Sequence, residues 1–362
     1  MNAKIEEILH IFALFSEKVF SINYVQLYLI IFTTQIYKKC GMYMQISVII
    51  PAYNAAKYLN RCIESVANQG LLHDCYEAIV INDGSTDDSI DILNALCEKY
   101  SFLKYVDVEN AGVSCARNKG VLEACGEYLL FLDADDCFYP NVFERIYKEM
   151  SDGKLDMMLL NYKHISLDGS FLEQPYHMEL NDSNIISGRE FLLRDFYPAM
   201  VPLYVYKRTF LIANQLKMIP IRHEDEEFVP RAIFYANRIK YLPLCFYSYF
   251  QNNDSFMNQY CESNALYMVA AMVSLNNFKI TVSNDSKIVA YFDDHIAVII
   301  MRLFKNSIRC GGRGQADMIE KIKEGGLLPL KPRKTSFYYW MFNMSPFFFE
   351  RYYRFIKQRP KN

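Results

Sequence analysis

Three carboxylates follow one apolar stretch of the sequence. Residues 128–132 read Tyr-Leu-Leu-Phe-Leu, which predicts a buried central strand, and Asp133, Asp135 and Asp136 come directly after it. Clustered carboxylates repel one another and are costly to desolvate, so this cluster needs a counter-charge. Hard divalent cations such as Mg²⁺ and Mn²⁺ prefer carboxylate oxygens and often share them with the phosphates of a substrate. We therefore expect a cation at the end of this strand.

The strand belongs to a regular alternation of strands and helices that begins near residue 45. The apolar runs that predict strands cover residues 46–50, 76–81, 103–108 and 127–132, the first of them stopped by Pro51. Helical spacing of apolar residues separates these runs, and residues 112–125 form the third of the intervening helices. Such an alternation predicts an α/β fold with a mainly parallel central sheet flanked by helices.

Polar side chains stand at the carboxyl end of each predicted strand. Asn54 follows the first strand, Asp83 ends the second, Asn110 follows the third and Asp133 follows the fourth. Ligands of open α/β sheets bind at the carboxyl ends of the strands. The pattern therefore predicts one polar site along this edge of the sheet.

The second half of the chain is less regular. Residues 155–161 predict another strand, and the acidic run Glu224–Glu227 enters a predicted helix. From about residue 262 the chain is expected to be helical. It ends in aromatic clusters at 337–342 and 347–349, interleaved with Lys and Arg. Two interpretations stay open for this tail: an amphipathic element on a membrane surface, or a helix packed back onto the protein.

Composition narrows the class of protein. The chain has 362 residues, of which 52% are hydrophobic and 22% charged, so it is globular and large enough for a domain with an appendage. A net charge of -2 gives no general attraction to nucleic acid. The ten cysteines include no Cys-x-x-Cys pair and no zinc spacing, which favours free thiols in a reducing cytosol.

The first 43 residues do not match the pattern that follows. They carry no convincing secretory signal, and their apolar run at 25–32 is too short to span a bilayer. Met42 and Met44 stand just before the first strand, so one hypothesis is that translation starts there. The alternative is an interfacial helix.

Four motifs in order resemble the family 2 glycosyltransferases. They are Ser47–Asn54, Asn82–Ser89, Asn110–Asn118 and Leu132–Asp136, and the last resembles the Asp-x-Asp motif of that family. A looser resemblance extends to about residue 257 through His223-Glu224-Asp225 and a Tyr-rich segment. In that segment Phe250 and Asn252 stand where the family often carries arginines, which leaves its phosphate or acceptor contacts in doubt.

The resemblance implies a GT-A fold and transfer of a sugar from a nucleotide diphosphate donor, with inversion at the anomeric carbon. It also implies a bound divalent cation, Mn²⁺ or Mg²⁺. The expected organisation is an N-terminal extension at 1–43, a glycosyltransferase domain at 44–257 and a helical C-terminal region at 258–362. Within the domain, residues 44–150 would bind the nucleotide sugar and residues 151–257 the acceptor.

The resemblance also assigns residues to roles. Asp135 is the expected metal ligand, with a share for Asp133, while Asp136 is expected to support the site or cap a helix. Asp83 would bind the base, typically uracil, and Arg117 would help to hold the nucleotide. The full set of expected donor-binding residues is Pro51, Ala52, Tyr53, Asn54, Asp83, Arg117, Asp133, Ala134 and Asp135.

Inverting transfer needs a base that takes the proton of the acceptor hydroxyl. The resemblance favours Asp225 for this role, with Glu224 as the second choice. The simpler alternative is that the acidic run 224–227 is a solvated helix start stabilised by the helix dipole.

The expected donor is a UDP-sugar and the expected acceptor is a glycan or a polyprenyl-linked glycan, in the synthesis of a surface polysaccharide. The expected location is the cytoplasm, at the inner face of the cell membrane, with peripheral contact through residues 331–362. Two other classes stay open. A nucleotidyltransferase would also use paired carboxylates and a metal, but Pro51–Asn54 lacks the Gly-rich basic loop that holds a triphosphate. The other alternative is an inactive module that binds a sugar nucleotide.

Overall fold

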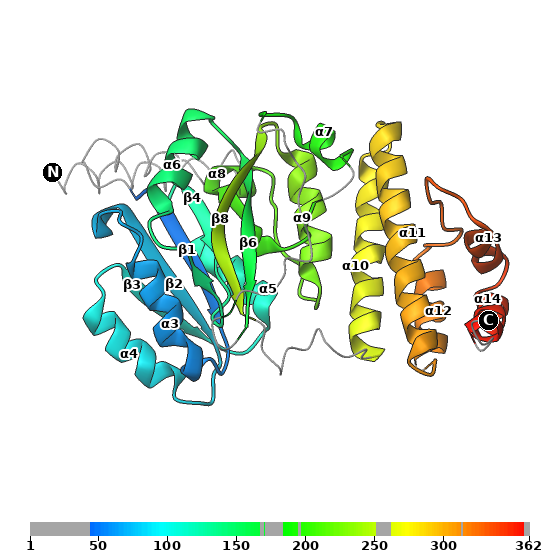
Figure 1. Ribbon diagram of the computed structural model, residues 1–362, viewed down its shortest axis with the longest axis horizontal. Coiled ribbons are helices and arrows are strands. Elements are labelled where there is room, and N and C mark those ends of the chain that lie inside the picture. Colours follow the sequence, from blue (N-terminus) through cyan, green and yellow to red (C-terminus); the bar gives the residue numbers. More distant parts are fainter. Residues whose placement is uncertain are drawn as a thin grey trace, which may run out of the picture.

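The structure is a computed structural model, and it describes residues 44–166, 170, 184–194, 197–250, 262–312 and 314–357. Within these ranges one eight-stranded sheet forms the centre of the molecule, and a group of helices lies to one side of it (Figure 1). The predicted α/β class, with a mainly parallel sheet and a helical C-terminal region, is confirmed. The predictions for residues 1–43 lie outside the described residues.

Four parallel strands form the first half of the sheet, in the order β3-β2-β1-β4. They are β1 (Ile46–Ala52), β2 (Tyr76–Asp83), β3 (Leu103–Val108) and β4 (Tyr128–Phe131). Every residue of β1, β2 and β4 is buried, which explains why these strands are continuous apolar runs. The connecting helices are α3 (Ala56–Ala67), α4 (Ser89–Lys99) and α5 (Val113–Glu123).

The first strand does not stop at Pro51 as the sequence indicates, but continues to Ala52. The pairing of β1 with β4 ends at Ile49, whose carbonyl accepts a hydrogen bond from the Leu132 amide. Alternate residues of a strand direct their amides to the same neighbour, so Pro51 faces the side on which pairing has already ended. The missing N–H of proline therefore removes no hydrogen bond from the sheet.

Helix α5 lies unusually close to the sheet. A Cβ atom at Gly120 would come within 2.3 Å of the Ile49 side chain, so only glycine fits at this contact. Arg117 lies one turn earlier on the same helix and is buried on the same side. The close approach of α5 thus directs an arginine toward the carboxyl ends of the strands.

The second half of the sheet is mixed. Its strands follow β4 in the order β7 (Tyr204–Lys207), β6 (Met157–Ile165), β8 (Ile239–Phe250) and β5 (Cys137–Phe138). Strand β7 is antiparallel to both neighbours, β6 and β8 are parallel, and β5 is antiparallel to β8. The helices of this half are α6 (Phe143–Asp152), α7 (Gly188–Leu192), α8 (Arg208–Ala213) and α9 (Glu224–Tyr235). Two short 3₁₀ turns, η1 (His73–Cys75) and η2 (Val201–Leu203), complete the elements before the C-terminal helices.

In the C-terminal region the described residues form helices and connecting loops, and no strand. The helices are α10 (Glu262–Thr281), α11 (Ser286–Arg309), α12 (Gln315–Glu324), α13 (Phe337–Met344) and α14 (Pro346–Lys357). Helix α10 lies beside α9, and Ser274 donates a hydrogen bond of 2.9 Å to Glu227 across this contact (Figure 1). None of the helices in the described ranges is both long enough and apolar enough to cross a membrane.

Candidate active site

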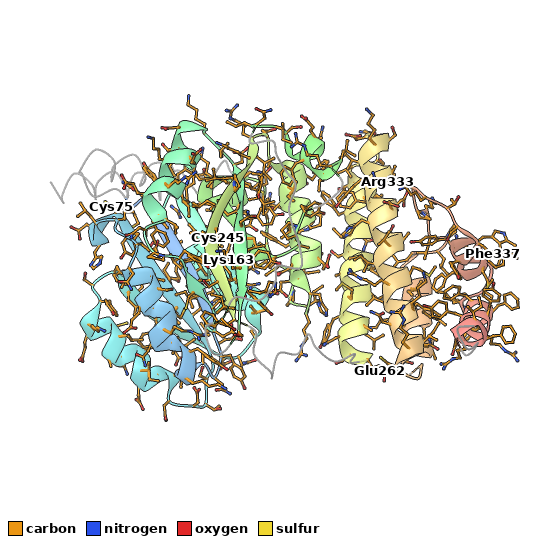
Figure 2. The ribbon with its side chains drawn as sticks, in the orientation of Figure 1. Cys75, Lys163, Cys245, Glu262, Arg333 and Phe337 are labelled. Atoms are coloured by element: carbon orange, nitrogen blue, oxygen red, sulfur yellow. The ribbon has the colours of Figure 1, made fainter. Side chains whose placement is uncertain are left out.

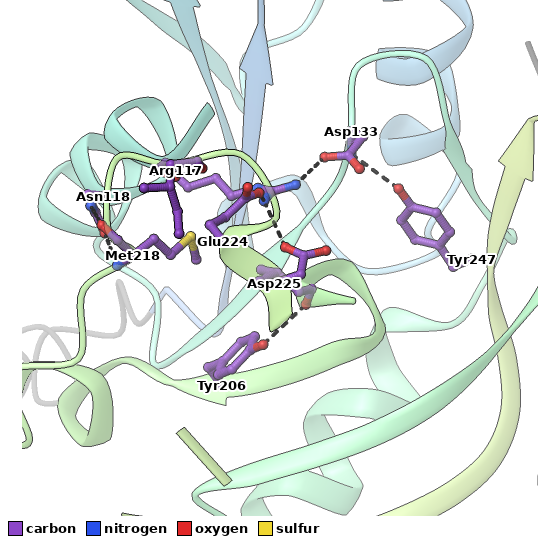
Figure 3. Close-up of polar contacts among 11 residues, drawn as sticks. Arg117, Asn118, Asp133, Tyr206, Met218, Glu224, Asp225 and Tyr247 are labelled. Carbon is purple, nitrogen blue, oxygen red and sulfur yellow. Dashed lines mark hydrogen bonds and ion pairs between the residues drawn. The ribbon is translucent and has the colours of Figure 1, made fainter. Parts of the chain in front are cut away.

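Arg117 lies at the centre of a cluster of three carboxylates, one from the loop after β4 and two from the start of α9. Its Nη2 atom is 2.7 Å from Asp133 Oδ1, just beyond β4, and its Nη1 atom is 2.5 Å from Glu224 Oε1 on α9. The same Nη1 atom is 3.4 Å from Asp225 Oδ1 (Figure 3). The side chain of Arg117 is only 4% exposed, so it is a buried connection between the end of the parallel strands and the start of α9.

The electrostatic environment keeps this arginine charged. Burial alone lowers the pKa of Arg117, but Asp133, Asp225 and Glu224 raise it by more, and the net shift is upward. A guanidinium can contact several carboxylates in a fixed geometry because its donors form a planar fork. Removing this cation would leave three carboxylates close together with no counter-charge.

Helix α9 places its acidic start inward and not toward solvent. His223 precedes the helix in the left-handed conformation, with φ 62° and ψ 35°, which non-glycine residues rarely adopt. Taken as whole residues, Glu224 is 7% exposed and Glu227 is 1% exposed. The interpretation of this run as a simple solvated helix start therefore does not describe it.

Asp225 differs from Glu224 in its access to solvent. The Asp225 side chain is 25% exposed, against 9% for Glu224. Burial raises the pKa of Asp225 well above its ordinary value; Arg117 opposes this shift, while Glu224 adds to it. Asp225 is thus the carboxylate of the pair that combines access with a raised pKa.

Asp83 organises the loop before α5. Its two carboxylate oxygens accept hydrogen bonds of 2.8 Å from the amides of Ala111 and Gly112. Gly112 directly precedes α5 with φ +88°, a conformation that favours glycine. Asp83 therefore sets the start of the helix that carries Arg117, and its expected contact with a base stays a prediction.

The loop after β1 is fixed to the loop after β2. Asn54 has φ 50°, and its side-chain oxygen accepts a hydrogen bond of 2.8 Å from the Thr86 amide. The Asn54 amide in turn donates to Ser85 Oγ at 2.9 Å. Tyr53 beside it is 54% exposed, whereas Pro51 and Ala52 are buried in β1. Of the residues expected here to line a nucleoside pocket, Tyr53 has a ring open to a ligand.

The three opening carboxylates have different environments. Asp136 is 1% exposed and accepts hydrogen bonds from the Tyr247 hydroxyl at 2.6 Å and the Phe250 amide at 2.8 Å. Burial and repulsion from Asp135 and Asp133 raise its pKa well above the ordinary value. Asp136 therefore joins the loop to β8 and does not face a ligand.

Asp133 and Asp135 are both partly buried, and Ala134 between them is 8% exposed. The Tyr247 hydroxyl accepts a hydrogen bond of 3.3 Å from the Asp133 amide, and Arg61 donates to the Asp135 carbonyl at 2.5 Å. The sequence did not single out Arg61, which lies on α3 and had only helical spacing around it. Its guanidinium also lies 3.6 Å from the centre of the Phe250 ring.

The donor atoms at this loop fit a hard cation. Among the described residues no group of three or more His, Cys, Asp or Glu side chains could hold a metal on its own. Asp133 and Asp135 nevertheless supply carboxylate oxygens, and Mg²⁺ is typically bound through one or two carboxylates together with substrate phosphates and water. The residues present therefore fit a cation that is shared with a diphosphate.

Residues 47–212 match the family model described as glycosyl transferase family 2. An uncharacterized glycosyltransferase, YibD of Escherichia coli K12, is 30% identical over 61% of this chain and 65% of its own length. The chain thus spans just under two thirds of that relative. The putative glycosyltransferase EpsH of Bacillus subtilis 168 is 28% identical over 79% of this chain and 83% of its own length.

A third relative is the poly(ribitol-phosphate) beta-glucosyltransferase of Bacillus spizizenii, 30% identical over 54% of this chain and 30% of its own length. Among solved structures, residues 1–349 of S. aureus TarS in complex with UDP-GlcNAc superpose with a TM-score of 0.64 at 21% identity. That match covers 87% of this chain and 91% of the solved one. The likeness confirms the GT-A-type architecture.

Proposed function

Because the chain belongs to the family 2 glycosyltransferases, we propose that it transfers a sugar from a UDP-sugar to a hydroxyl of a glycan or polyprenyl-linked glycan, with inversion. The observation that carries this proposal is the position of Arg117. Its guanidinium contacts Asp133 at the end of the parallel strands and both Glu224 and Asp225 at the start of α9. One site thus has carboxylates suited to a metal diphosphate beside carboxylates suited to a base.

The donor would lie along the carboxyl ends of β1, β2 and β4. Tyr53 offers an exposed ring for the nucleoside, and the loop that Asp83 holds before α5 lies at the same edge of the sheet. The complex of S. aureus TarS with UDP-GlcNAc supports a UDP-sugar, because a protein of the same fold binds one. Arg117 is assigned a share in holding the nucleotide, although its described partners are carboxylates.

Asp135, with Asp133, would hold the Mn²⁺ or Mg²⁺. When bound, such a cation supplies positive charge against the negative charge that develops as the nucleoside diphosphate departs. Hydrogen bonds to the main chain of these two aspartates hold their carboxylates in place. Arg61 fixes the main chain at Asp135, and Tyr247 contacts the amide of Asp133.

Asp225 would act as the base. Its partial exposure lets an acceptor hydroxyl approach, and its raised pKa makes it a better proton acceptor than an ordinary aspartate. Arg117 would stabilise the ionised form that accepts the proton. Glu224, closer to Arg117 and less exposed, is the second choice for the base and would hold the arginine in place.

The biological setting is part of the proposal. The names of EpsH and of the poly(ribitol-phosphate) glucosyltransferase support a role in making a capsular, extracellular or other cell-surface polysaccharide. We assign catalysis to a domain at 44–257, with the nucleotide sugar bound by 44–150 and the acceptor by 151–257. Residues 258–362 would form the separate helical region. Sugar transfer would take place in the cytoplasm at the inner face of the membrane.

A thermal-shift screen tests the donor assignment. The full chain is heated with UDP-, GDP- and dTDP-sugars, each with and without Mn²⁺. A ligand present at one hundred times its Kd stabilises the native state by about 2.7 kcal/mol, so a binder raises Tm clearly. We expect UDP-sugars to do so in a Mn²⁺-dependent way. A Tm that no nucleotide sugar changes would contradict the proposal.

A further inference from the structure

Helices α13 and α14 present a group of large apolar side chains to solvent. Six large apolar side chains on these two helices are each more than half exposed: Phe337, Trp340, Met344, Phe347, Phe348 and Phe355. The opposite sides of the same helices are buried, with Phe342 and Phe349 both 0% exposed. The buried sides show that the tail packs back onto the protein, while the interpretation of the tail as a membrane-surface element stays a prediction for the exposed sides. Figure 2 shows Phe337 at the end of the molecule away from the sheet.

The exposed rings form one surface. Phe337, Trp340 and Met344 follow helical spacing along one side of α13, and the first two rings stack at 5.6 Å. Phe337 also contacts Tyr352 of α14 edge to face at 5.7 Å, which joins the two helices. We call the six exposed side chains the aromatic face. Soluble proteins rarely expose such a large contiguous apolar patch unless it is an interaction site.

A cationic pocket adjoins the aromatic face. Its volume is about 290 Å³, and it is lined along one side of α11 by Val298, Met301, Arg302, Lys305, Asn306 and Arg309, with Tyr339 of α13 opposite. Arg302 is 3.7 Å from Glu226, but within the described ranges neither Lys305 nor Arg309 forms an ion pair with a carboxylate. We call this the α11 pocket.

The pocket and the aromatic face are parts of one surface. Tyr339 in the pocket directly precedes Trp340 of the aromatic face. Tyr338 is also on α13, and the centre of its ring lies 5.0 Å from Nζ of Lys305 on α11. On α14 the exposed Arg351 lies between Phe348 and Phe355, so cations border the apolar side chains on this helix too.

We propose that this surface docks on an anionic phospholipid bilayer, with a lipid phosphate in the α11 pocket and the aromatic face in the interfacial region. Aromatic rings favour the level of the headgroups, and basic side chains attract anionic lipid by about 1 kcal/mol each. A symmetric pairing of two copies through this surface is disfavoured, because it would bring two cationic pockets together. The proposal deepens the membrane contact proposed above and rests on that contact, but not on the transfer chemistry.

Co-sedimentation of the full chain with vesicles tests the proposal. Vesicles of phosphatidylglycerol and phosphatidylcholine are compared with phosphatidylcholine alone. Because residues such as Phe342 and Phe349 are core residues, deleting the tail would expose the core, and point substitutions give a cleaner test. The pocket variant is Lys305→Gln/Arg309→Gln, and its control is Lys321→Gln/Lys323→Gln on the exposed side of α12.

We expect the pocket variant to lower the partition coefficient on the anionic vesicles about thirtyfold, and the control to leave it nearly unchanged. The variant Trp340→Ser/Phe348→Ser should lower binding to both kinds of vesicle, whereas Leu72→Ser, at an exposed leucine near η1, should not. Melting curves verify that all variants fold.

Four results would overturn the proposal. The first is a wild-type chain that stays in solution with anionic vesicles, and the second is a pair of pocket and control variants that lose binding equally. The third is an aromatic-face variant that binds vesicles normally but changes from dimer to monomer in ultracentrifugation. The fourth is inorganic phosphate that raises Tm only when the pocket is intact, with vesicle binding unaffected by the pocket variant, because the pocket would then serve a soluble phosphate. None of these results bears on sugar transfer.

Discussion

Arg117 and Glu224 are 107 residues apart in the sequence, yet Arg117 Nη1 donates a hydrogen bond to Glu224 Oε1 at 2.5 Å in the protein interior. This contact joins the carboxyl ends of the parallel strands to the helix that carries the proposed base. It also explains why the acidic start of α9 lies inward: the buried cation attracts carboxylates that would otherwise be solvated.

The first prediction concerns stability. Replacing Arg117 by Gln should lower the free energy of unfolding by about 3–5 kcal/mol, because it removes the cation from a buried ionic cluster. Lys119→Gln on the same helix is the matched control. It breaks only the exposed pair with Glu123, which is worth about 0.5 kcal/mol or less. Urea unfolding of both variants measures the difference, and equal losses would show that Arg117 does not hold the cluster together.

The second prediction concerns Asp136 and pH. Burial, with repulsion from Asp135 and Asp133, raises the pKa of Asp136, although Tyr247 and Phe250 oppose the shift. Between the ordinary pKa of about 3.9 and the raised value, the folded state holds a proton that the unfolded state has lost. This carboxyl therefore makes folding less favourable as pH rises through that window.

Asp136→Asn cannot lose a proton, so its free energy of unfolding should fall less than that of the wild type between pH 5 and pH 8. The exposed Asp152→Asn variant on α6 is the control and should follow the wild type. Denaturant unfolding at both pH values decides. Curves for Asp136→Asn and wild type that change with pH in parallel would contradict the assignment.

The third prediction concerns the pH dependence of catalysis. A base must be ionised, and the pKa of Asp225 is raised, so kcat/KM should fall on acidification with a midpoint above about 4. Release of UDP from a UDP-sugar measures this. The nearby His223, whose pKa is lowered by burial, also takes up a proton on acidification and could produce a similar fall in rate. His223→Gln is therefore the control. The acid limb should persist in that variant, and its disappearance would assign the limb to the histidine.

Local pattern predicted the parallel half of the sheet well. β3 begins and ends at the predicted residues, because its apolar run is bounded by turns on both sides. The later strands were harder. β7 and the first residues of α8 lie within one stretch of mixed periodicity at 203–211, and β8 has no alternation that marks its twelve residues. Packing against β4 and β6, and not local propensity, makes these segments regular.

The site was predictable at the strand ends and less so between them. Asp83, Asp133 and Asn54 follow directly from strand boundaries, but the partners of Arg117 depend on how two halves of the fold meet. The same applies to Asp136: sequence placed it with Asp133 and Asp135, and only tertiary hydrogen bonds to β8 separate it from them. Arg61 carried no local signal, because one arginine on an amphipathic helix is ordinary.

The fourth prediction separates the proposed metal ligand from the proposed base. Asp135→Asn should lose the Mn²⁺-dependent part of UDP-sugar binding. Asp225→Asn should retain that binding, because Asp225 lies on α9 and is assigned to the acceptor. Asp152→Asn again serves as the control. Isothermal titration with the UDP-sugar selected by the thermal screen measures binding in each variant.

The central claim is that Asp225 is the base beside a separate donor site. Its most direct measurement is the rate of UDP release by the wild type and by Asp225→Asn, both saturated with Mn²⁺ and the UDP-sugar that the thermal screen selects. The account predicts unchanged donor affinity and a rate that falls about 10²- to 10⁴-fold, the usual contribution of a general base. Asp225→Asn that releases UDP at the wild-type rate, or that no longer binds the donor, would contradict the assignment of Asp225 as the base beside a separate donor site.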